Sequence, residues 1–567
     1  MSTMTDAPTS GWGRFVKFIE VPQDEDATYK TDNMTNRDLI PMPPNRRTYH
    51  IWSYCVYWCI SGLCISAYTL GSSLLAYGLN CKQALGAIAI GAICVAPLVV
   101  ACGWMGAQHR IGFTVASRFT WGVRGFYFPV IIRTFTTIFW DGLQAYWGGQ
   151  SVACCLGAMS LSFHNMDTTL AGGVLLLKDL VGMLVYYVFF LSIMILPPER
   201  LQIPFIVSSF GFIFTLIGLL AWACSAAGGV GPLWNVQSAP LHGDFSWAML
   251  FGVAGVLGSW GGGTLGQSDW TRYAKKPYNP LIAQIFIAPF SIFICGLVGI
   301  IVTSASSFVL DGQVIWQPFQ LLPALQEHYG HTSKARAAIF FAGAGCTGAQ
   351  LGISIVLNSV SAGMDIAGCV PRFINIRRGA YLMAVLGFAS CPWEYLSNAA
   401  VFLTVIAGFG IFIAPFTGVM LADYFVVRKR TLVMEDLYIR SPESIYWFWN
   451  GFNWRPLVAW IIGLAPLFPG FIMSVTNADA WNGWVKLFHI DFYVGVSVAF
   501  VAMVIINKIA PPPHLGEGVK HIDDSIPFGL KDDVSSGVSV NNVYVPSDDA
   551  KEKLDDPEAY LPHPSTA

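Results

Sequence analysis

An indole and a primary amide lie one helical turn apart in the stretch from Phe139 to Gln144. Trp140 and Gln144 are four residues apart, so both project from the same face of a helix. An indole stacks on flat rings, and an amide offers a donor and an acceptor to the edge of a uracil-like or hydantoin-like group. The pair therefore suits a planar nitrogen heterocycle. The structural alternative is that Trp140 faces lipid or core and Gln144 bonds a neighbouring helix.

A second large indole, Trp260, stands in the glycine-rich apolar stretch from Phe251 to Tyr273. Glycine is a poor helix former, so we expect the triplet Gly261–Gly263 to unwind. Unwound backbone inside a membrane is tolerated where it lines a cavity, as in the interrupted helices of secondary transporters. The stretch predicts a broken helix with Trp260 facing a ligand. The alternative is a packing face, because Gly258 and Gly262 form a small-xxx-small pair.

Three further polar positions lie within apolar segments and are candidates for function. Asn358 is a second mid-segment amide, which could complete the polar rim of the same site or bond a neighbouring helix. Asp141 adjoins Trp140 and is a candidate proton carrier, or else a structural partner of Arg133. Asp269 lies at the end of its apolar segment, where a structural latch is favoured over contact with a ligand.

The composition places the chain among polytopic helical membrane proteins. Of its 567 residues, 54% are hydrophobic and only 12% are charged, whereas soluble proteins carry about 25% charged residues. Apolar runs of about 20 residues recur along most of the length. The net charge of −2 and the absence of a basic tract give no indication of nucleic-acid binding. The 13 cysteines mostly lie inside apolar runs and are interpreted as small buried hydrophobes.

The chain divides into a polar N-terminal tail (residues 1–48), a membrane domain (49–510) and a polar C-terminal tail (511–567) that we expect to be disordered. The membrane domain holds twelve predicted spans, and its basic residues concentrate in the loops on the side of the N-terminus. This bias predicts that both tails are cytosolic. The spans are expected at 52–78, 84–107, 126–159, 180–197, 201–224, 246–266, 281–305, 337–364, 380–392, 399–422, 456–473 and 492–507.

No motif of an enzyme stands out in the sequence. There is no Walker loop, zincin pattern or nucleophile–base set, so neither catalysis nor direct coupling to ATP is expected. Gly261, Gly263 and Gly266 satisfy a dinucleotide-binding spacing, but no strand precedes them, so that interpretation fails. No metal site and no cofactor are expected.

Long motifs give the chain a family resemblance. It resembles the nucleobase-cation-symport family 1, in particular the fungal uracil, uridine, allantoin and thiamine permeases, over about Leu39 to Pro511. The similarity is carried by the third and sixth spans and by three further stretches. These are Asn358–Gly368 continuing into Pro371–Gly379, then Leu421–Arg428, and Asn453–Pro456.

The resemblance implies twelve helices, the first ten forming two inverted five-helix repeats of the amino-acid transporter-like fold, with the first and sixth helices broken. In the family's bacterial hydantoin-transporting member, the substrate ring lies between two tryptophans, and amides hold its edge. Trp140 and Gln144 match the third-span pair, Trp260 matches the sixth-span tryptophan, and Asn358 matches the eighth-span amide. The resemblance thus implies that these four residues bind the substrate.

Three departures bear on the substrate and the coupling ion. Cys64 stands where several relatives have a first-span amide. Gly352 and Ile353 replace the hydroxyl residues that ligate sodium in the bacterial relative, so proton coupling is preferred. Gln267–Asp269 resembles the thiamine and nicotinamide-riboside branch, whereas Trp140 with Gln144 resembles the uracil branch.

We therefore expect a proton-coupled importer in the fungal plasma membrane. Its first expected substrate is uracil, allantoin or a related heterocycle. A thiamine or nucleoside permease is the alternative, followed by a nutrient sensor on the same fold that does not transport.

Overall fold

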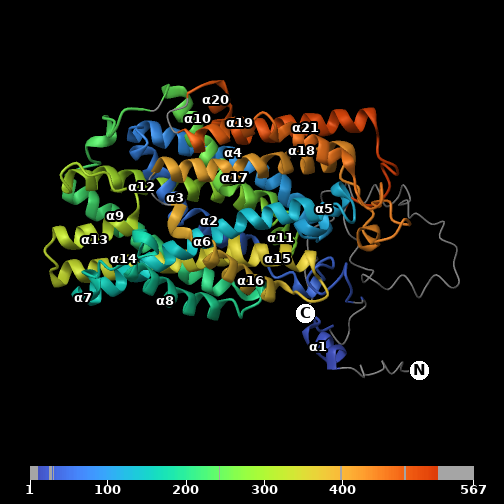
Figure 1. The fold of residues 1–567 in the computed structure, drawn as a ribbon, viewed down its shortest axis with the longest axis horizontal. Helices are drawn as coiled ribbons and strands as arrows, with labels where there is room; N and C mark the ends of the chain where they lie inside the picture. Colours follow the sequence, from blue (N-terminus) through green and yellow to red (C-terminus); the bar gives the residue numbers. More distant parts are fainter. Residues whose placement is uncertain are drawn as a thin grey trace, which may run out of the picture.

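Long helices run side by side along one common direction in the computed structural model of the chain (Figure 1). The structure describes residues 11–23, 29, 31–241, 243–395, 399–477 and 481–520. The N-terminal helix α1 lies beyond one end of the bundle, while α7 and α13 lie at the other end. The long helices and the segments continuous with them are α2 (Ile51–Gly62), α3 (Ile65–Ala76), α4 (Cys81–His109), α6 (Tyr127–Met159), α8 (Leu177–Ile193), α9 (Gln202–Ala227), α10 (Phe245–Leu265), α12 (Ala288–Val309), α14 (Ser333–Ile353), α15 (Val360–Cys369), α16 (Ile376–Ala389), α17 (Ala399–Leu421), α18 (Trp454–Leu464), α19 (Phe468–Thr476) and α21 (Asp491–Ile509).

Short elements join these helices at both ends of the bundle. They include one two-stranded antiparallel ribbon, β1 with β2, in which Thr169 pairs with Leu176. Three π-helical turns extend longer helices. The short elements are α1 (Gly11–Ile19), α5 (Phe113–Trp121), α7 (Leu161–His164), α11 (Ser268–Thr271), α13 (Pro318–His328), α20 (Gly483–Phe488), β1 (Thr169–Leu170), β2 (Leu175–Leu176), the π-helices η5 (Ala283–Ile287), η6 (Ser354–Ser359) and η8 (Ala422–Val427), and the 3-10 turns η1 (Pro44–Arg46), η2 (Ala171–Gly173), η3 (Pro198–Arg200), η4 (Pro232–Trp234), η7 (Pro392–Tyr395) and η9 (Glu435–Tyr438).

Each of the twelve predicted spans overlaps a helix or a pair of helices. Within the described residues, eight helical stretches are long and apolar enough to cross a membrane, and nine if the bent pair α18–α19 forms one span. Of the remaining predicted spans, α8 and α16 have only 17 and 14 residues. The other, α6, has 33 residues but carries polar side chains along its whole length.

Helix α6, with 33 residues, is the longest helix that carries residues of the candidate site. It starts just after Gly125, and Pro129 falls in its first turn, where a missing N–H costs no helical hydrogen bond. With no later proline, the helix continues unbroken to Met159. Trp140, Asp141 and Gln144 therefore occupy rigid positions near its middle.

The first predicted span consists of two helices. Leu63 and Cys64 lie between α2 and α3 in non-helical conformations, with ψ of 78° at Leu63 and φ of −144° at Cys64. The Leu63 N–H still donates to the Cys59 carbonyl at 2.7 Å. The interruption therefore opens the helix at Cys64, whose side chain is fully buried.

The glycine triplet of the sixth predicted span does not unwind, so that prediction is wrong. Helix α10 runs through Gly261–Gly263 and ends at Leu265, and α11 begins three residues later at Ser268. The cost of about 1 kcal/mol per helical glycine is smaller than that of leaving backbone groups unpaired away from water. The Gly262 carbonyl also accepts a hydrogen bond from Arg133 Nε at 3.2 Å, which stabilises the helical form.

The packing alternative for these glycines is correct only in part. A Cβ at Gly258 would lie 3.1 Å from the Ile406 carbonyl, and one at Gly261 would lie 2.8 Å from the Phe492 ring. These two glycines allow close approach of α17 and α21. A Cβ at Gly262 would meet nothing within 4 Å, so this glycine faces open space instead.

The segment before α2 packs tightly against the end of the bundle beyond which α1 lies. Met34, Asn36, Leu39 and Met42 are all buried. The Asn36 amide donates to the Pro371 carbonyl at 3.0 Å, and Arg118 donates to the Met34 carbonyl at 3.0 Å. Residues 31–42 therefore cover the helix ends at this side.

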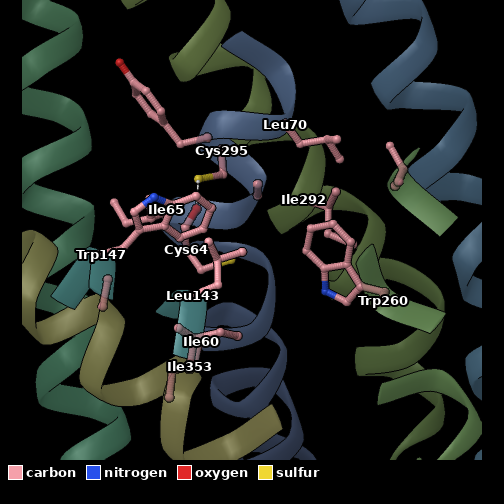
Figure 2. Close-up of a cluster of buried hydrophobic side chains, with 14 of the residues drawn as sticks. Ile60, Cys64, Ile65, Leu70, Leu143, Trp147, Trp260, Ile292, Cys295 and Ile353 are labelled. Carbon is pink, nitrogen blue, oxygen red and sulfur yellow. Dashed lines mark hydrogen bonds between the residues drawn. The ribbon is translucent and has the colours of Figure 1, made fainter. Parts of the chain in front are cut away.

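All 13 cysteines lie among the described residues, and none forms a disulfide. Twelve are buried or half-buried, in agreement with their interpretation as small apolar side chains. Cys391, directly after α16, is exposed. The buried thiol of Cys295 donates to the Cys64 carbonyl at 3.2 Å, which fastens the interruption of the first span to α12 (Figure 2).

Candidate functional site

Trp140, Gln144, Trp260 and Asn358 line one small cavity in the middle of the bundle. The cavity measures about 40 Å³ and lies where the interruption between α2 and α3 meets α6, α10, α14 with η6, and α17. The four side chains come from three separate spans of the sequence. The other lining residues are Ser61, Cys64, Ser66, Thr136, Thr137, Gly258, Ser259, Gly262, Gly263, Ile353, Leu357, Phe409 and Ile413.

The two tryptophans are held differently. Trp260 is 3% exposed, and its indole N–H donates to the Ser61 carbonyl at 3.1 Å, so its ring is fixed against α2. Trp140 is half-buried, and its ring lies 6.1 Å from that of Phe409 at an angle of 51°. The cavity therefore has one fixed aromatic wall and one that is less constrained.

The Gln144 amide is held by two partners. Its Nε2 donates to Ser66 Oγ at 2.5 Å, and its Oε1 accepts from Gln350 Nε2 at 2.8 Å. Gln350 also donates to the Gln144 backbone carbonyl at 2.9 Å. This network ties α6 to α3 and α14. A ligand that bonds to Gln144 must share or replace these contacts.

Asn358 presents a free donor at the cavity. It lies on the π-helix η6, whose wider turn is typical of functional positions in helices. The residue is 5% exposed, and its Nδ2 has no hydrogen-bond partner among the described residues. A buried amide without a partner is costly, so a ligand acceptor at this point would be strongly favoured.

Cys64 lies at the cavity wall within the interruption of the first span. Its thiol donates to the Ser61 carbonyl at 3.4 Å. At the eighth span, Ile353 also lines the cavity, and the hydroxyl of the adjacent Ser354 accepts from Tyr186 at 2.9 Å. The first of these positions supplies a weak thiol donor, and Ile353 supplies an apolar side chain.

Asp141 is fully buried, but Arg133 is not its partner, contrary to one of the two predicted roles. Ser359 Oγ donates to Asp141 Oδ1 at 2.6 Å, whereas Oδ2 has no hydrogen-bond partner in the described structure. A separation of eight residues turns a helix by about 80° beyond two full turns, so Arg133 and Asp141 leave α6 in different directions. Asp141 faces Ser359, just after Asn358.

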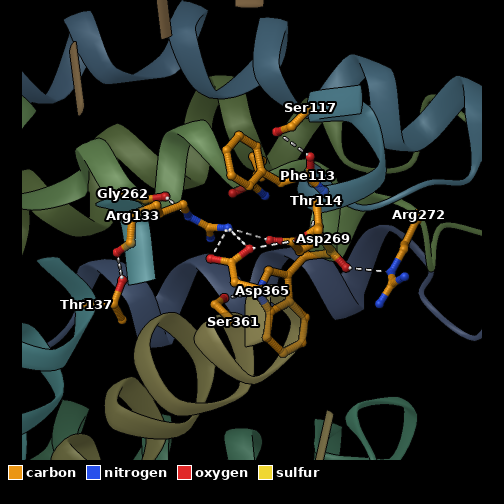
Figure 3. A network of polar contacts seen from close by, with 12 residues as sticks. Phe113, Thr114, Ser117, Arg133, Thr137, Gly262, Asp269, Arg272, Ser361 and Asp365 are labelled. Carbon is orange, nitrogen blue, oxygen red and sulfur yellow. Dashed lines mark hydrogen bonds and ion pairs between the residues drawn. The ribbon is translucent and has the colours of Figure 1, made fainter. Parts of the chain in front are cut away.

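Arg133 instead joins two other carboxylates, those of Asp269 and Asp365 (Figure 3). Its Nη1 lies 3.0 Å from Asp269 Oδ2 and 2.9 Å from Asp365 Oδ1. Asp269 also accepts from the Phe113 N–H at 2.8 Å, as expected of a structural latch. The network joins α6, α11, α15 and the start of α5, and it lies on the side where residues 31–42 cover the bundle.

Sequence reasoning missed several members of the site. Gln350 and Phe409 carry no pattern that distinguishes them from ordinary membrane-helix residues, although Phe409 stands between two glycines, Gly408 and Gly410. Such a bulky side chain between glycines is a usable signal for an exposed ring face. Gln350 offers no comparable signal in its own neighbourhood.

The chain matches a protein family over residues 41–495. The matching family is described as a permease for cytosine/purines, uracil, thiamine and allantoin. Among individual proteins, the transporter aclS of Aspergillus oryzae is 30% identical, over 90% of this chain and 92% of its own. The uridine permease of Saccharomyces cerevisiae is 30% identical, over 89% and 82%. A thiamine transporter of that yeast, THI72, is 29% identical, over 86% and 81%.

The fold also matches solved structures. Mhp1, a nucleobase-cation-symport-1 family transporter with bromovinylhydantoin bound, superposes with a TM-score of 0.64 at 19% identity, covering 86% of this chain and 97% of its own. Its inward-facing conformation gives a TM-score of 0.67 at 19% identity, covering 88% and 100%. At this identity the likeness establishes the fold and leaves the ligand to be argued from the site.

Proposed function

This chain belongs to the family of permeases for cytosine/purines, uracil, thiamine and allantoin, and on that basis we propose that it imports a small nitrogen heterocycle together with protons. Members named among its relatives are permeases and transporters rather than enzymes. The chain is accordingly a membrane transporter of small heterocycles. We further propose that the coupling ion is the proton and that the transported substrate is uracil, allantoin or a related base.

The proposed architecture is twelve spans, with the first ten as two inverted five-helix repeats. The interruption at Leu63 and Cys64 supports a broken first span. In the sixth, the helix ends at Leu265 and restarts at Ser268, which supports a break a few residues later than the glycine triplet. The loops rich in basic residues support cytosolic termini in a plasma-membrane protein.

The observation that carries the proposal is the convergence of two indoles and two amides on one cavity. Flat rings stack well on Trp140 and Trp260, and the edge of a uracil or hydantoin carries donors and acceptors that match Gln144 and Asn358. A base has few atoms, and ligand efficiency reaches at most about 1.5 kcal/mol per non-hydrogen atom. Strong binding therefore needs contacts on both faces of the ring as well as at its edge.

The cavity must widen to take such a ring. A space of about 40 Å³ holds a few water molecules at most. Trp260 is fixed by its hydrogen bond, so the widening falls to Trp140 and Phe409. A change of this kind fits alternating access, in which ligand binding and helix movement are coupled.

Proton coupling is proposed through Asp141. Its carboxyl group is buried next to the site, with one oxygen free of partners among the described residues. An ionisable group inside a membrane protein is by default a functional candidate. Sodium needs several oxygen ligands, and Gly352 and Ile353 supply no side-chain oxygen.

Two alternatives remain open to test. The relatives include thiamine and nicotinamide riboside transporters, and Gln267–Asp269 resembles that branch. A thiamine or nucleoside permease is therefore the second candidate. A nutrient sensor on the same fold would bind a heterocycle but give no counterflow in vesicles.

The test is uptake of radiolabelled uracil, allantoin and thiamine by cells that express the full chain, with a panel of unlabelled heterocycles as competitors. Gln144→Ala should abolish uptake while the protein still reaches the cell surface. The matched control is Gln313→Ala, the same substitution at an exposed loop residue, which should leave uptake unchanged. Wild-type transport by Gln144→Ala would remove Gln144 from the site.

A further inference from the structure

A second, larger cavity lies at the end of the bundle opposite the N-terminal segment. It measures about 580 Å³ and is lined by the second half of α6, the start of α8, α13 and η7. In Figure 1 this is the end that carries α7 and α13. Its lining combines apolar side chains with the polar side chains of Tyr146, Gln150, Lys178, Asp179 and Gln326.

This cavity is separate from the one between Trp140 and Trp260. Gln150 lies six residues beyond Gln144 on α6, a rise of about 9 Å. Trp147 lies between them along the helix, is fully buried and packs 5.8 Å from the ring of Phe402. Bulky side chains thus fill the layer between the two levels of α6.

Asp179 is the best-placed charged group in this cavity. The residue is 8% exposed, yet its Oδ2 accepts from both Tyr146 Oη and Gln150 Nε2, each at 3.2 Å. Its Oδ1 has no hydrogen-bond partner among the described residues. Gln150 Oε1 is buried, and it too has no hydrogen-bond partner within the described part of the chain. Two acceptors on adjoining groups are therefore left unpaired at one place.

The charges around these acceptors favour a cation. Lys178 is occupied elsewhere, since its Nζ lies 3.6 Å from Asp167 Oδ1 and donates to the His164 carbonyl at 3.1 Å. Glu394 adds a second carboxylate to the lining. An anion here would meet two carboxylates, whereas a cation would pair with the buried Asp179 carboxylate, which has no ion-pair partner among the described residues.

We propose that Asp179 and Gln150 form a second binding site, which takes a planar amidinium group such as that of a protonated aminoheterocycle. An amidinium presents two parallel N–H donors, which match the free oxygens of a carboxylate and a neighbouring amide. Phe319 and Trp393 supply aromatic surface in the same lining, suited to a flat cation. This site differs in chemistry from the central cavity. The lining of the central cavity offers amides to the edge of a ligand and contains no carboxylate.

Benzamidine, a flat amidinium that is not a nucleobase, is the probe for this site. The full chain carrying Trp140→Ala, reconstituted in nanodiscs, silences the central cavity and should still bind radiolabelled benzamidine. Adding Asp179→Asn should weaken that binding at least tenfold, because the neutral amide loses the charge while keeping the shape. Gln150→Ala should weaken it severalfold. Unlabelled uracil should not compete.

The matched control is Glu394→Gln, which removes one charge from the same lining without touching the two acceptors. Equal weakening by Glu394→Gln and Asp179→Asn would overturn the proposal in favour of a diffuse negative field. No binding to the Trp140→Ala chain would also overturn it. Thermal unfolding of each variant separates loss of the site from loss of the fold. Because benzamidine binding is measured without transport, its failure is distinguishable from failure of the proposed import.

Discussion

At the scale of single residues, the central cavity combines side chains that already form hydrogen bonds within the protein with one amide donor that forms none among the described residues. Trp260 and Gln144 are fixed by hydrogen bonds to Ser61, Ser66 and Gln350. Asn358 Nδ2 has no partner in the described structure. The fixed groups define the shape of the cavity, and Asn358 is the donor most readily available to an incoming carbonyl oxygen.

Asn358→Ala should therefore weaken transport without weakening the fold. A hydrogen bond to a neutral group contributes about 0.5–1.5 kcal/mol, so the apparent KM for the transported base should rise about two- to tenfold. The measurement is concentration-dependent uptake, with thermal unfolding in detergent beside it. An unchanged KM would place Asn358 outside the site.

The residues that could be predicted from the sequence are those with a spacing or motif behind them. Trp140 with Gln144 followed from a four-residue interval, Trp260 from the glycine-rich stretch around it, and Asn358 from being an amide within an apolar segment. The family resemblance implied the same four residues. Gln350 could not be recognised because its role is to hold Gln144, and nothing in its own neighbourhood shows this. Of the two roles considered for Asp141, that of partner to Arg133 is wrong, because a sequence interval within one helix does not specify which neighbouring helix each side chain faces.

At the scale of elements, the end of the sixth span is determined by packing rather than by local helix preference. Glycine content indicated Gly261–Gly263, but the helix ends at Leu265, two residues later, where the following Gly266 lies beside the Arg133 guanidinium. Arg133 bridges the Gly262 carbonyl, Asp269 and Asp365. Such a network brings together residues more than 200 positions apart, and propensity in a single stretch contains no information about it.

Gly266→Ala should destabilise the protein, because a Cβ at this position would overlap the Arg133 guanidinium. Displacing a buried, paired charge costs on the order of 3–5 kcal/mol. Thermal unfolding followed by size-exclusion chromatography should show a clear drop in midpoint. Gly262→Ala is the control, since a Cβ there meets nothing within 4 Å. Equal midpoints for the two variants would contradict the assigned role of Arg133.

At the scale of the whole molecule, the two ends of the bundle differ. One end is covered by residues 31–42 above the Arg133 network, and the other holds a cavity of about 580 Å³. The number of apolar segments and the bias of basic residues predicted the general arrangement of spans. They could not predict that part of the N-terminal segment is buried, because its sequence is polar and its burial depends on loops far along the chain.

Uptake should depend on the proton gradient and not on sodium. A protonophore should collapse uptake of the labelled base, because Asp141 would no longer be loaded from the outer side. Replacing sodium with choline in the assay buffer should leave the initial rate unchanged. Initial rates in cells measure both effects, and sodium dependence would overturn the proton assignment.

The exposed Cys391 gives the molecule a natural attachment point for a dye. It is the exposed one of the 13 cysteines, and it lies two residues before Trp393, which lines the larger cavity. A maleimide fluorophore would therefore mark this end of the bundle in the unmodified chain. Quenching by the nearby indole would then report on events at this end of the bundle in real time, without a cysteine-free background.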